Sequence, residues 1–172
     1  MPADMQHAHE VWREFFVVGG HTGAVLLGLV FVGMEIHLDR LQPRHHRYLL
    51  AAGSALSFLF VLLISLVMLA PPLWPWLPAS ALVGLSLLTF LGSSAPLFSA
   101  LRLPVRPKGR GLLVIYLLPY VASFVLLGGS LGLLFGWLDA IYLIALGLFG
   151  LVATGAVNAW IFLVRGRDSV GE

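Results

Sequence analysis

The sequence has no cysteine and few charged residues. Because none of its 172 residues is cysteine, disulfide bonds, thiolate metal ligands and cysteine nucleophiles are excluded. Charged side chains make up 10% of the chain and hydrophobic residues 59%, whereas soluble domains are typically about 25% charged and about 45–50% apolar. The mean hydropathy is +0.96. So little charge cannot cover a surface in water, and we expect lipid to surround most of the chain.

A signal peptide and a separate soluble domain are also missing from the pattern. The first 14 residues, MPADMQHAHEVWRE, lack the basic segment and the small-residue cleavage site of a signal peptide, so we expect this end to be retained. The formal net charge is +2, but the basic residues lie in short loops between apolar segments, which indicates membrane orientation and not nucleic-acid binding. We expect one transmembrane domain over residues 1–172.

Five apolar segments are each long enough to cross a hydrocarbon core of about 30 Å. We expect the other four helices to pack around the first segment, because it contains the one histidine that lies deep in an apolar segment. The segments predict an all-α membrane protein, a bundle of five transmembrane helices at about 15–36, 48–69, 76–101, 112–135 and 140–164.

Basic residues are distributed unevenly along the chain. Nine of the ten lie in the loops after the first and third segments or in the C-terminal tail. The positive-inside rule therefore predicts that the N-terminus is outside and the C-terminus is in the cytoplasm. The minimal role of these loops is to set orientation, and they can also bind anionic lipid headgroups.

Small residues recur four positions apart, a spacing that allows two helix backbones to approach closely. We expect packing seams either within one bundle or between protomers. Five helices are too few to enclose a wide pathway, so we expect a homo-oligomer. The small residues in question are Gly20, Ala24 and Gly28, then Gly128, Gly132 and Gly136, and finally Gly150 and Thr154.

His21, Gly28 and Glu35 are seven residues apart in the first segment. Seven residues turn a helix through about 700°, so each lies only about 20° from the last and the three share a face. Ionisable groups in membrane spans usually point into the bundle. We therefore expect this face to point inward, with His21 and Glu35 about 21 Å apart along the axis.

A second group of polar residues is predicted near the cytoplasmic rim. Pro96 and Pro119 each free a backbone carbonyl, which neighbours or water must satisfy inside a membrane. Together these residues predict a polar vestibule that opens toward the cytoplasm. Counting residues at 1.5 Å each places Glu35, Ser93, Ser94 and Asn158 in this layer, with Ser54, Ser57, Tyr116 and Tyr120 a little deeper.

His21 and Glu35 each have two interpretations, one functional and one structural. His21 can titrate or line an ion path, since histidine changes charge between pH 5 and 8, or it can form an interhelical hydrogen bond. Glu35 can hold a cation or a proton, or it can pair with a loop arginine such as Arg40 or Arg110.

Metal binding and catalysis are weighed in the same way. Glu35 and Asp39 are four residues apart on one helical face, a spacing suited to metal binding, but short polar loops and tails contain such residues by default. We predict no metal site and no cofactor. We also predict no enzyme, because the sequence contains no paired intramembrane aspartates and no glycine-flanked nucleophilic serine. The metal alternatives are Glu35, His37, Asp39, His45 and His46 in one group, and His7, His9 and Glu10 in the other.

The first segment resembles the opening of a group of small bacterial multi-pass membrane proteins. The resemblance is carried by Trp12-x-Glu14-Phe15-Phe16-Val17, by Gly28 to Val32, and by Ile36-x-Leu38-Asp39-Arg40. Some of those proteins are labelled modulators of a membrane AAA protease. The resemblance implies a multi-pass protein of the cell membrane, in a bacterial inner membrane, and assigns no role to His21.

Two functions follow from these patterns. The leading interpretation is an oligomeric ion or proton pathway lined by the first helix, with His21 as its constriction and Glu35 as its charge on the cytoplasmic side. The alternative is a non-conducting membrane adaptor or regulatory subunit of another membrane protein, such as a protease modulator.

Overall fold

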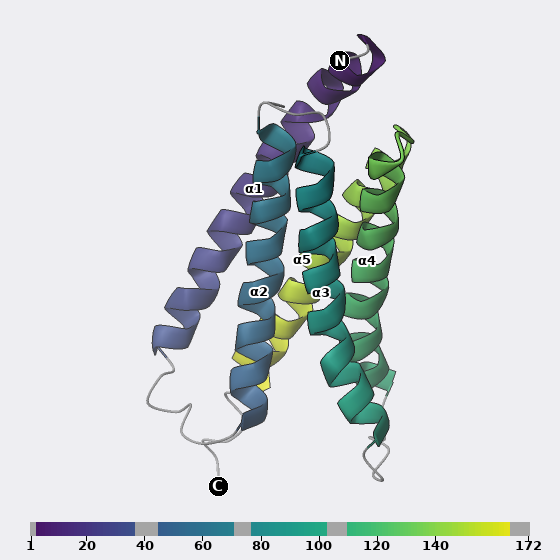
Figure 1. Cartoon of the computed structure of the whole chain (residues 1–172). Helices are drawn as coiled ribbons and strands as arrows, with labels where there is room; N and C mark the ends of the chain where they lie inside the picture. Colours follow the sequence, from purple (N-terminus) through teal and green to yellow (C-terminus); the bar gives the residue numbers. More distant parts are fainter. Residues whose placement is uncertain (1–2, 37–44, 71–76, 103–109, 166–172) are drawn as a thin grey trace, which may run out of the picture.

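The computed structural model describes residues 3–36, 45–70, 77–102 and 110–165, and every regular element in these ranges is an α-helix (Figure 1). The all-α prediction with five helices is therefore confirmed. Within the described ranges, α1, α2, α4 and α5 are long and apolar enough to cross a membrane, and α3 contributes the shorter apolar segment Leu77–Ser93. The helices are α1 (Ala3–Ile36), α2 (His45–Leu69), α3 (Leu77–Arg102), α4 (Arg110–Leu134) and α5 (Ala140–Arg165).

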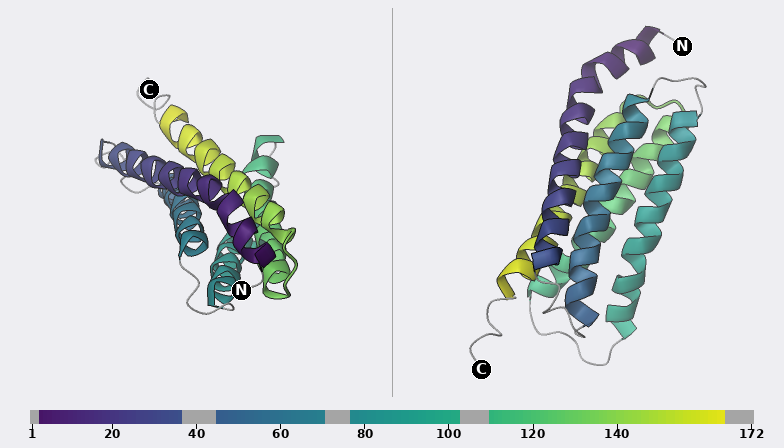
Figure 2. Two further views of the ribbon diagram at one scale, coloured as in Figure 1. Left: turned by 90° about the horizontal axis from the view of Figure 1, so that it is seen from above. Right: turned by 90° about the vertical axis from the view of Figure 1, so that its left-hand side faces the viewer.

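The bounds of α2 to α5 lie within three residues of those predicted, whereas α1 begins twelve residues earlier than predicted, at Ala3 instead of Phe15. Hydropathy detects the part of a helix that suits lipid, and residues 3–14 are polar but contain no proline or glycine to interrupt a helix. With 34 residues, α1 is about 51 Å long. Its N-terminal part extends beyond the other helices (Figures 1 and 2).

The other helices do not pack around α1. It packs mainly on α2, on the outside of an arrangement in which α2 contacts α5, α5 contacts α4, and α4 contacts α3. Half of the residues in the apolar span of α5 are buried, against 17% in α1. The expected central position of α1 is therefore wrong, and α5 is the more enclosed helix. The reason is that α5 offers small residues to two neighbours, whereas the glycines of α1 that are in contact face only α2.

Aromatic rings attach the N-terminal half of α1 to α5. Trp12 lies edge-on to Tyr142 with ring centroids 4.9 Å apart, and Phe15 lies 5.7 Å from Phe149. Edge-to-face pairs of this kind add a modest attraction beyond the apolar area that they bury. They hold this part of α1 against a helix that it otherwise barely touches.

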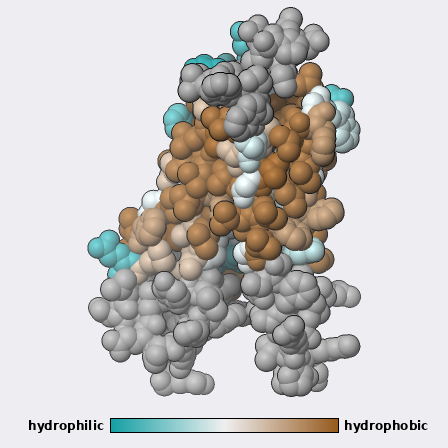
Figure 3. Space-filling view, viewed as in Figure 1, coloured by the Kyte–Doolittle hydropathy of each residue, from teal (hydrophilic) through white to brown (hydrophobic). Residues whose placement is uncertain are grey.

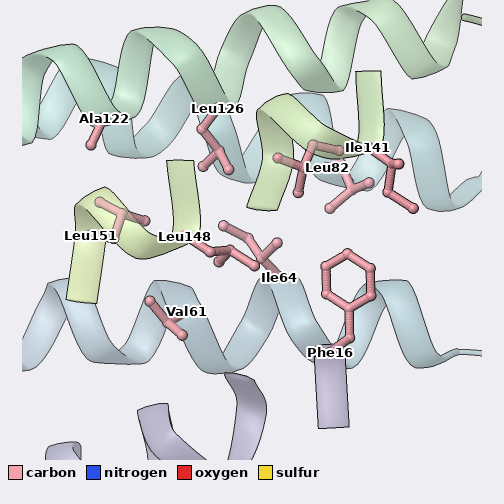
Figure 4. Close-up of a cluster of buried hydrophobic side chains, with 10 residues drawn as sticks. Phe16, Val61, Ile64, Leu82, Ala122, Leu126, Ile141, Leu148 and Leu151 are labelled. Carbon is pink, nitrogen blue, oxygen red and sulfur yellow. The ribbon is translucent and has the colours of Figure 1, made fainter. Parts of the chain in front are cut away.

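Apolar side chains from all five helices fill the centre of the bundle (Figure 4). Most of them are branched aliphatic residues, and the single aromatic ring, Phe16, comes from α1. The interior at this level is therefore dry and closely packed. The cluster contains Phe16, Val61, Ile64, Leu82, Ala122, Leu126, Ile141, Ile144, Leu148 and Leu151.

The backbones of α4 and α5 approach each other at glycines. A Cβ atom added to Gly150 would lie 2.6 Å from the Cβ of Ala122, and one added to Gly132 would lie 2.6 Å from the Cβ of Ala140. One added to Gly147 would lie 2.9 Å from the Cβ of Leu126. These separations are too short for real side chains, so glycine is required for this contact.

The other small residues of the predicted seams lie differently. Gly128 has no atom within 4 Å of an added Cβ, and Gly136 lies in the turn after α4 with a φ of +83°, a left-handed conformation that favours glycine. The hydroxyl of Thr154 donates to the Gly150 carbonyl oxygen at 2.8 Å.

Replacing Gly150 by alanine should destabilise the protein. The new methyl group would overlap Ala122, and overpacking of this kind typically costs about 1–3 kcal/mol. Gly128→Ala is the matched control on the open side of α4, where alanine should be neutral or stabilise the helix by up to about 1 kcal/mol. Unfolding of the purified protein in mixed micelles, followed by far-UV circular dichroism, measures both. Equal stability of the two variants would contradict the close α4–α5 contact.

Candidate functional site

The face of α1 that contains His21, Gly28 and Glu35 lies on the outside of the bundle. All three residues are exposed, and an added Cβ at Gly28 would have no atom within 4 Å. The prediction that this face points inward is therefore wrong for the single chain. The three residues do share one face, as their spacing predicts.

A different row of glycines turns α1 toward α2. A Cβ added to Gly23 would lie 3.0 Å from the carbonyl oxygen of Phe58 and 3.1 Å from the nitrogen of Leu62, so the two backbones nearly touch. Gly20, which is also buried, lies against Ser65. On a helical wheel His21 is about 100° from Gly20 and about 160° from Gly23. Packing of these glycines on α2 therefore directs His21 outward.

Ser65 has an unusual place in this contact. It is fully buried, and its Oγ has no hydrogen-bond partner among the described residues. The Oγ faces α1, 3.2 Å from the position of an added Cβ on Gly19. A glycine Cα–H can act as a weak donor to such an oxygen at a helix–helix contact. Ser65 is thus part of the α1–α2 contact, and a side chain at Gly19 would require its Oγ to shift slightly.

The exposed face of α1 combines small and ionisable residues. Ala24 and Gly28 are both exposed, and Val25 and Val32 beside them are also exposed. An ionisable side chain directed at lipid is energetically unfavourable, and exposed small residues leave room for the backbone of another helix to approach. This face suits contact with another helix better than contact with acyl chains.

The predicted polar layer is divided between two places. Asn158 of α5 is buried together with Ser54 and Ser57 of α2. The amide nitrogen of Asn158 is 3.7 Å from the position of an added Cβ on Gly53. Glu35 lies apart from them, on the exposed face of α1.

The rest of the layer lies between α3 and α4. The Oγ atoms of Ser93 and Ser123 are 3.1 Å apart. Tyr120 is half-buried and its ring centroid is 5.1 Å from that of Phe90. The side chains of Ser94 and Tyr116 lie outside the described part of the structure.

Hydroxyl pairs between α3 and α4 are a feature that the sequence analysis missed. The Oγ atoms of Ser86 and Ser130 are 2.7 Å apart, and both residues are fully buried. Ser86 and Ser93 are seven residues apart on α3, and Ser123 and Ser130 are seven apart on α4. This matched heptad spacing is the signal that could have revealed the contact.

The number of hydroxyl protons limits what these pairs can do. Ser86 lies 2.7 Å from the Leu82 carbonyl oxygen, and Ser130 lies 2.8 Å from that of Leu126. Each hydroxyl has one proton, so the two residues share two protons among three contacts.

The second pair has a defined direction. Ser123 donates to the Pro119 carbonyl oxygen at 2.7 Å, so Ser93 is the donor to Ser123. These hydroxyls are satisfied within the bundle, and their role is to hold α3 against α4.

The metal alternatives are only partly covered by the structure. Within the described residues, no group of three or more His, Asp or Glu side chains is placed to hold a metal ion. The side chains of the loop histidines, of Asp39, and of His7 and His9 in the tail lie outside the described part of the structure. Arg40 and Arg110, the two arginines predicted as possible partners of Glu35, also lie outside it.

Comparison with known proteins finds no family model, no curated protein and no solved structure that matches this chain.

Removing the hydroxyl of Ser86 or Ser130 should weaken the α3–α4 contact. Interhelical hydrogen bonds in membrane proteins contribute about 0.6 kcal/mol on average and up to about 1.7 kcal/mol. A double-mutant cycle with Ser86→Ala and Ser130→Ala, measured by unfolding in mixed micelles, should give a coupling energy in that range. Ser80→Ala is the control, because that exposed hydroxyl bonds only to Leu77 of its own helix. Strictly additive effects of the two substitutions would contradict the pairing.

Proposed function

We propose that this protein is a non-conducting membrane adaptor or regulatory subunit that docks a transmembrane helix of another membrane protein on the exposed face of α1. One observation carries the proposal: His21, Gly28 and Glu35 lie on the outer surface of the bundle. Four helices long and apolar enough to cross a membrane are compatible with a multi-span membrane protein. In that setting an outward histidine and exposed small residues favour a helix partner over lipid.

The interior of the single chain does not favour a pathway. Its centre is filled by aliphatic side chains from all five helices. Ser86 and Ser123 of the α3–α4 contact bond to another serine and to carbonyl oxygens. An ion crossing this region would have to break these contacts and enter an apolar core. For this reason we do not propose an ion path through the single chain. An ion path between copies of α1 is the second candidate.

The partner helix can be described by its chemistry. It needs small residues opposite Ala24 and Gly28, so that the two backbones can approach. It needs a hydrogen-bonding group at the depth of His21 and a donor or cation at the level of Glu35, about 21 Å further along the axis. A second copy packed in parallel would instead bring His21 near His21 and Glu35 near Glu35, and two carboxylates held close together repel each other. This favours a different protein as the partner.

The second candidate is a homo-oligomeric ion or proton pathway between copies of α1. It is favoured by one observation, that two ionisable residues share the exposed face at two depths. If copies assembled around this face, His21 and Glu35 would line the space between them. The two candidates therefore use the same face of α1 and differ in its occupant.

Gly28→Trp should prevent docking, because the large ring would stand on the exposed face of α1, where an added Cβ meets no atom of the bundle within 4 Å, and would keep a partner helix away. In membranes of the source cell solubilised in mild detergent, the wild-type chain should migrate in a complex larger than the purified chain, and Gly28→Trp should migrate as the purified chain. Leu146→Trp, at a position that is 59% exposed on α5, is the matched control and should stay in the complex. The proposal fails if wild type and Gly28→Trp both migrate as the purified chain, or if Gly28→Cys forms disulfide-linked homodimers in those membranes.

Purified protein in liposomes should conduct neither protons nor small cations between pH 5 and 8, the range in which histidine changes charge. His21→Ala should leave this result unchanged. The measurement is the decay of an imposed pH or cation gradient, reported by an enclosed dye. Flux that varies with pH and is altered by His21→Ala would favour the pathway and overturn the adaptor.

A further inference from the structure

The outer face of α1 follows a heptad repeat. Four valines recur every seven residues, and three residues after each valine comes an exposed small or ionisable residue. Alternating steps of three and four residues bring both sets onto one narrow stripe along the helix. The valines are Val11, Val18, Val25 and Val32, which are 62%, 63%, 62% and 53% exposed. The second set is Glu14, His21, Gly28 and Glu35. We call these eight residues the heptad stripe.

The heptad stripe points directly away from the bundle. Glu14 lies nine residues before Gly23, so the two are about 180° apart around α1, and Gly23 is the residue that nearly touches the backbone of α2. Residue type follows the repeat as closely as exposure does, because one position is always valine and the other is never a large aliphatic residue. Lipid does not distinguish the two positions of a heptad, whereas a helix that crosses at about 20° packs on each of them separately. The pattern therefore favours a partner helix.

The two glutamates of the stripe lie about one membrane thickness apart. Glu14 and Glu35 are separated by three heptads, about 32 Å along α1, and the hydrocarbon core of a bilayer is about 30 Å thick. Trp12, two residues before Glu14, packs on Tyr142 at the start of α5, and both are residue types that prefer the headgroup level. Hydrophobic side chains cover most of the middle of the visible surface, with hydrophilic ones toward both ends (Figure 3). In a membrane, one carboxylate therefore lies near each headgroup layer.

This charge pattern disfavours a second copy of the chain as the occupant. In a parallel pair, Glu14 would face Glu14 and Glu35 would face Glu35, and in an antiparallel pair Glu14 would face Glu35 at both ends. Two carboxylates held close together repel each other. Arg13 does not offset this repulsion, since it lies about 100° around the helix from Glu14 and outside the stripe. The same carboxylates attract basic side chains.

We propose, on the basis of the adaptor function above, that the heptad stripe binds a transmembrane helix with a lysine or arginine at each end, about 21 residues apart. Its basic side chains pair with Glu14 and Glu35 near the headgroups, which lysine and arginine reach from helix ends. Its apolar middle packs on the valines of the stripe. His21 lies about 10 Å from Glu14 along the axis, about a third of the way to Glu35. A hydroxyl or amide of the partner at that depth completes the match.

A synthetic helix tests this charge match. The probe is a dansyl-labelled peptide of about 20 leucine and alanine residues, with two lysines at each end and no tryptophan. Energy transfer from the tryptophans of the purified chain, in phosphatidylcholine liposomes, measures its binding. The lysine peptide should bind at least tenfold more tightly than the same peptide with two aspartates at each end, because only lysines are attracted to Glu14 and Glu35.

Neutral variants test each end of the stripe. Glu14→Gln and Glu35→Gln should each reduce the preference for the lysine peptide at least threefold, since each removes one of the two attractions. Both positions are exposed, so the substitutions should not disturb packing. Asp139→Asn, at an exposed carboxylate outside α1, is the matched control and should retain the full preference. Equal binding of the two peptides, or a preference that neither glutamine variant reduces, would overturn the proposal.

This experiment and the adaptor test fail separately. If the wild-type chain forms a complex in the source membranes that Gly28→Trp loses, while the two peptides bind equally, the adaptor function stands and the charge-matched partner is overturned. If the lysine peptide is preferred but no complex forms in those membranes, the charge match is supported and the adaptor function fails.

Discussion

The close approach of α4 and α5 is the contact on which the rest of the bundle depends. In lipid, two helices gain little from the hydrophobic effect and associate through close packing. Gly132, Gly147 and Gly150 allow that packing because they place no side chain of their own in the contact. α5 is then held against α4 on one side, while Gly155 receives the ring of Phe58 from α2 on another. This leaves the outside of α2 as the place for α1.

That outer position determines the chemistry that α1 presents. Its buried glycines contact α2, so the opposite face carries His21 and Glu35 away from the bundle. The serines between α3 and α4 point into the bundle and have protein partners, since Ser86 pairs with Ser130 and Ser93 pairs with Ser123. The contrast between the paired hydroxyls of the α3–α4 contact and the exposed ionisable face of α1 is the physical basis for assigning association to α1.

Backbone hydrogen bonding makes the two ends of the bundle different. At one end, α4 and α5 are joined by a tight turn that includes Gly136, and aromatic rings attach α1 beside it. At the other end, Pro119 interrupts the hydrogen bonds of α4, and α2 separates from α3.

The sequence was sufficient to predict the bounds of single helices and which residues share a helix face. It was not sufficient to predict the direction in which that face points. Hydropathy and proline positions predicted the bounds of α2 to α5 within three residues, because both act over a single helix. The start of α1 was missed because hydropathy reports suitability for lipid and does not detect a polar helix. Heptad spacing placed His21, Gly28 and Glu35 correctly on one face. Only the tertiary structure decided that this face points outward, because α1 has small residues on two sides: Gly19, Gly20 and Gly23 contact α2, whereas Ala24 and Gly28 are exposed. The choice between them depends on the shape of α2 around Phe58 and Ser65, which no spacing within α1 contains.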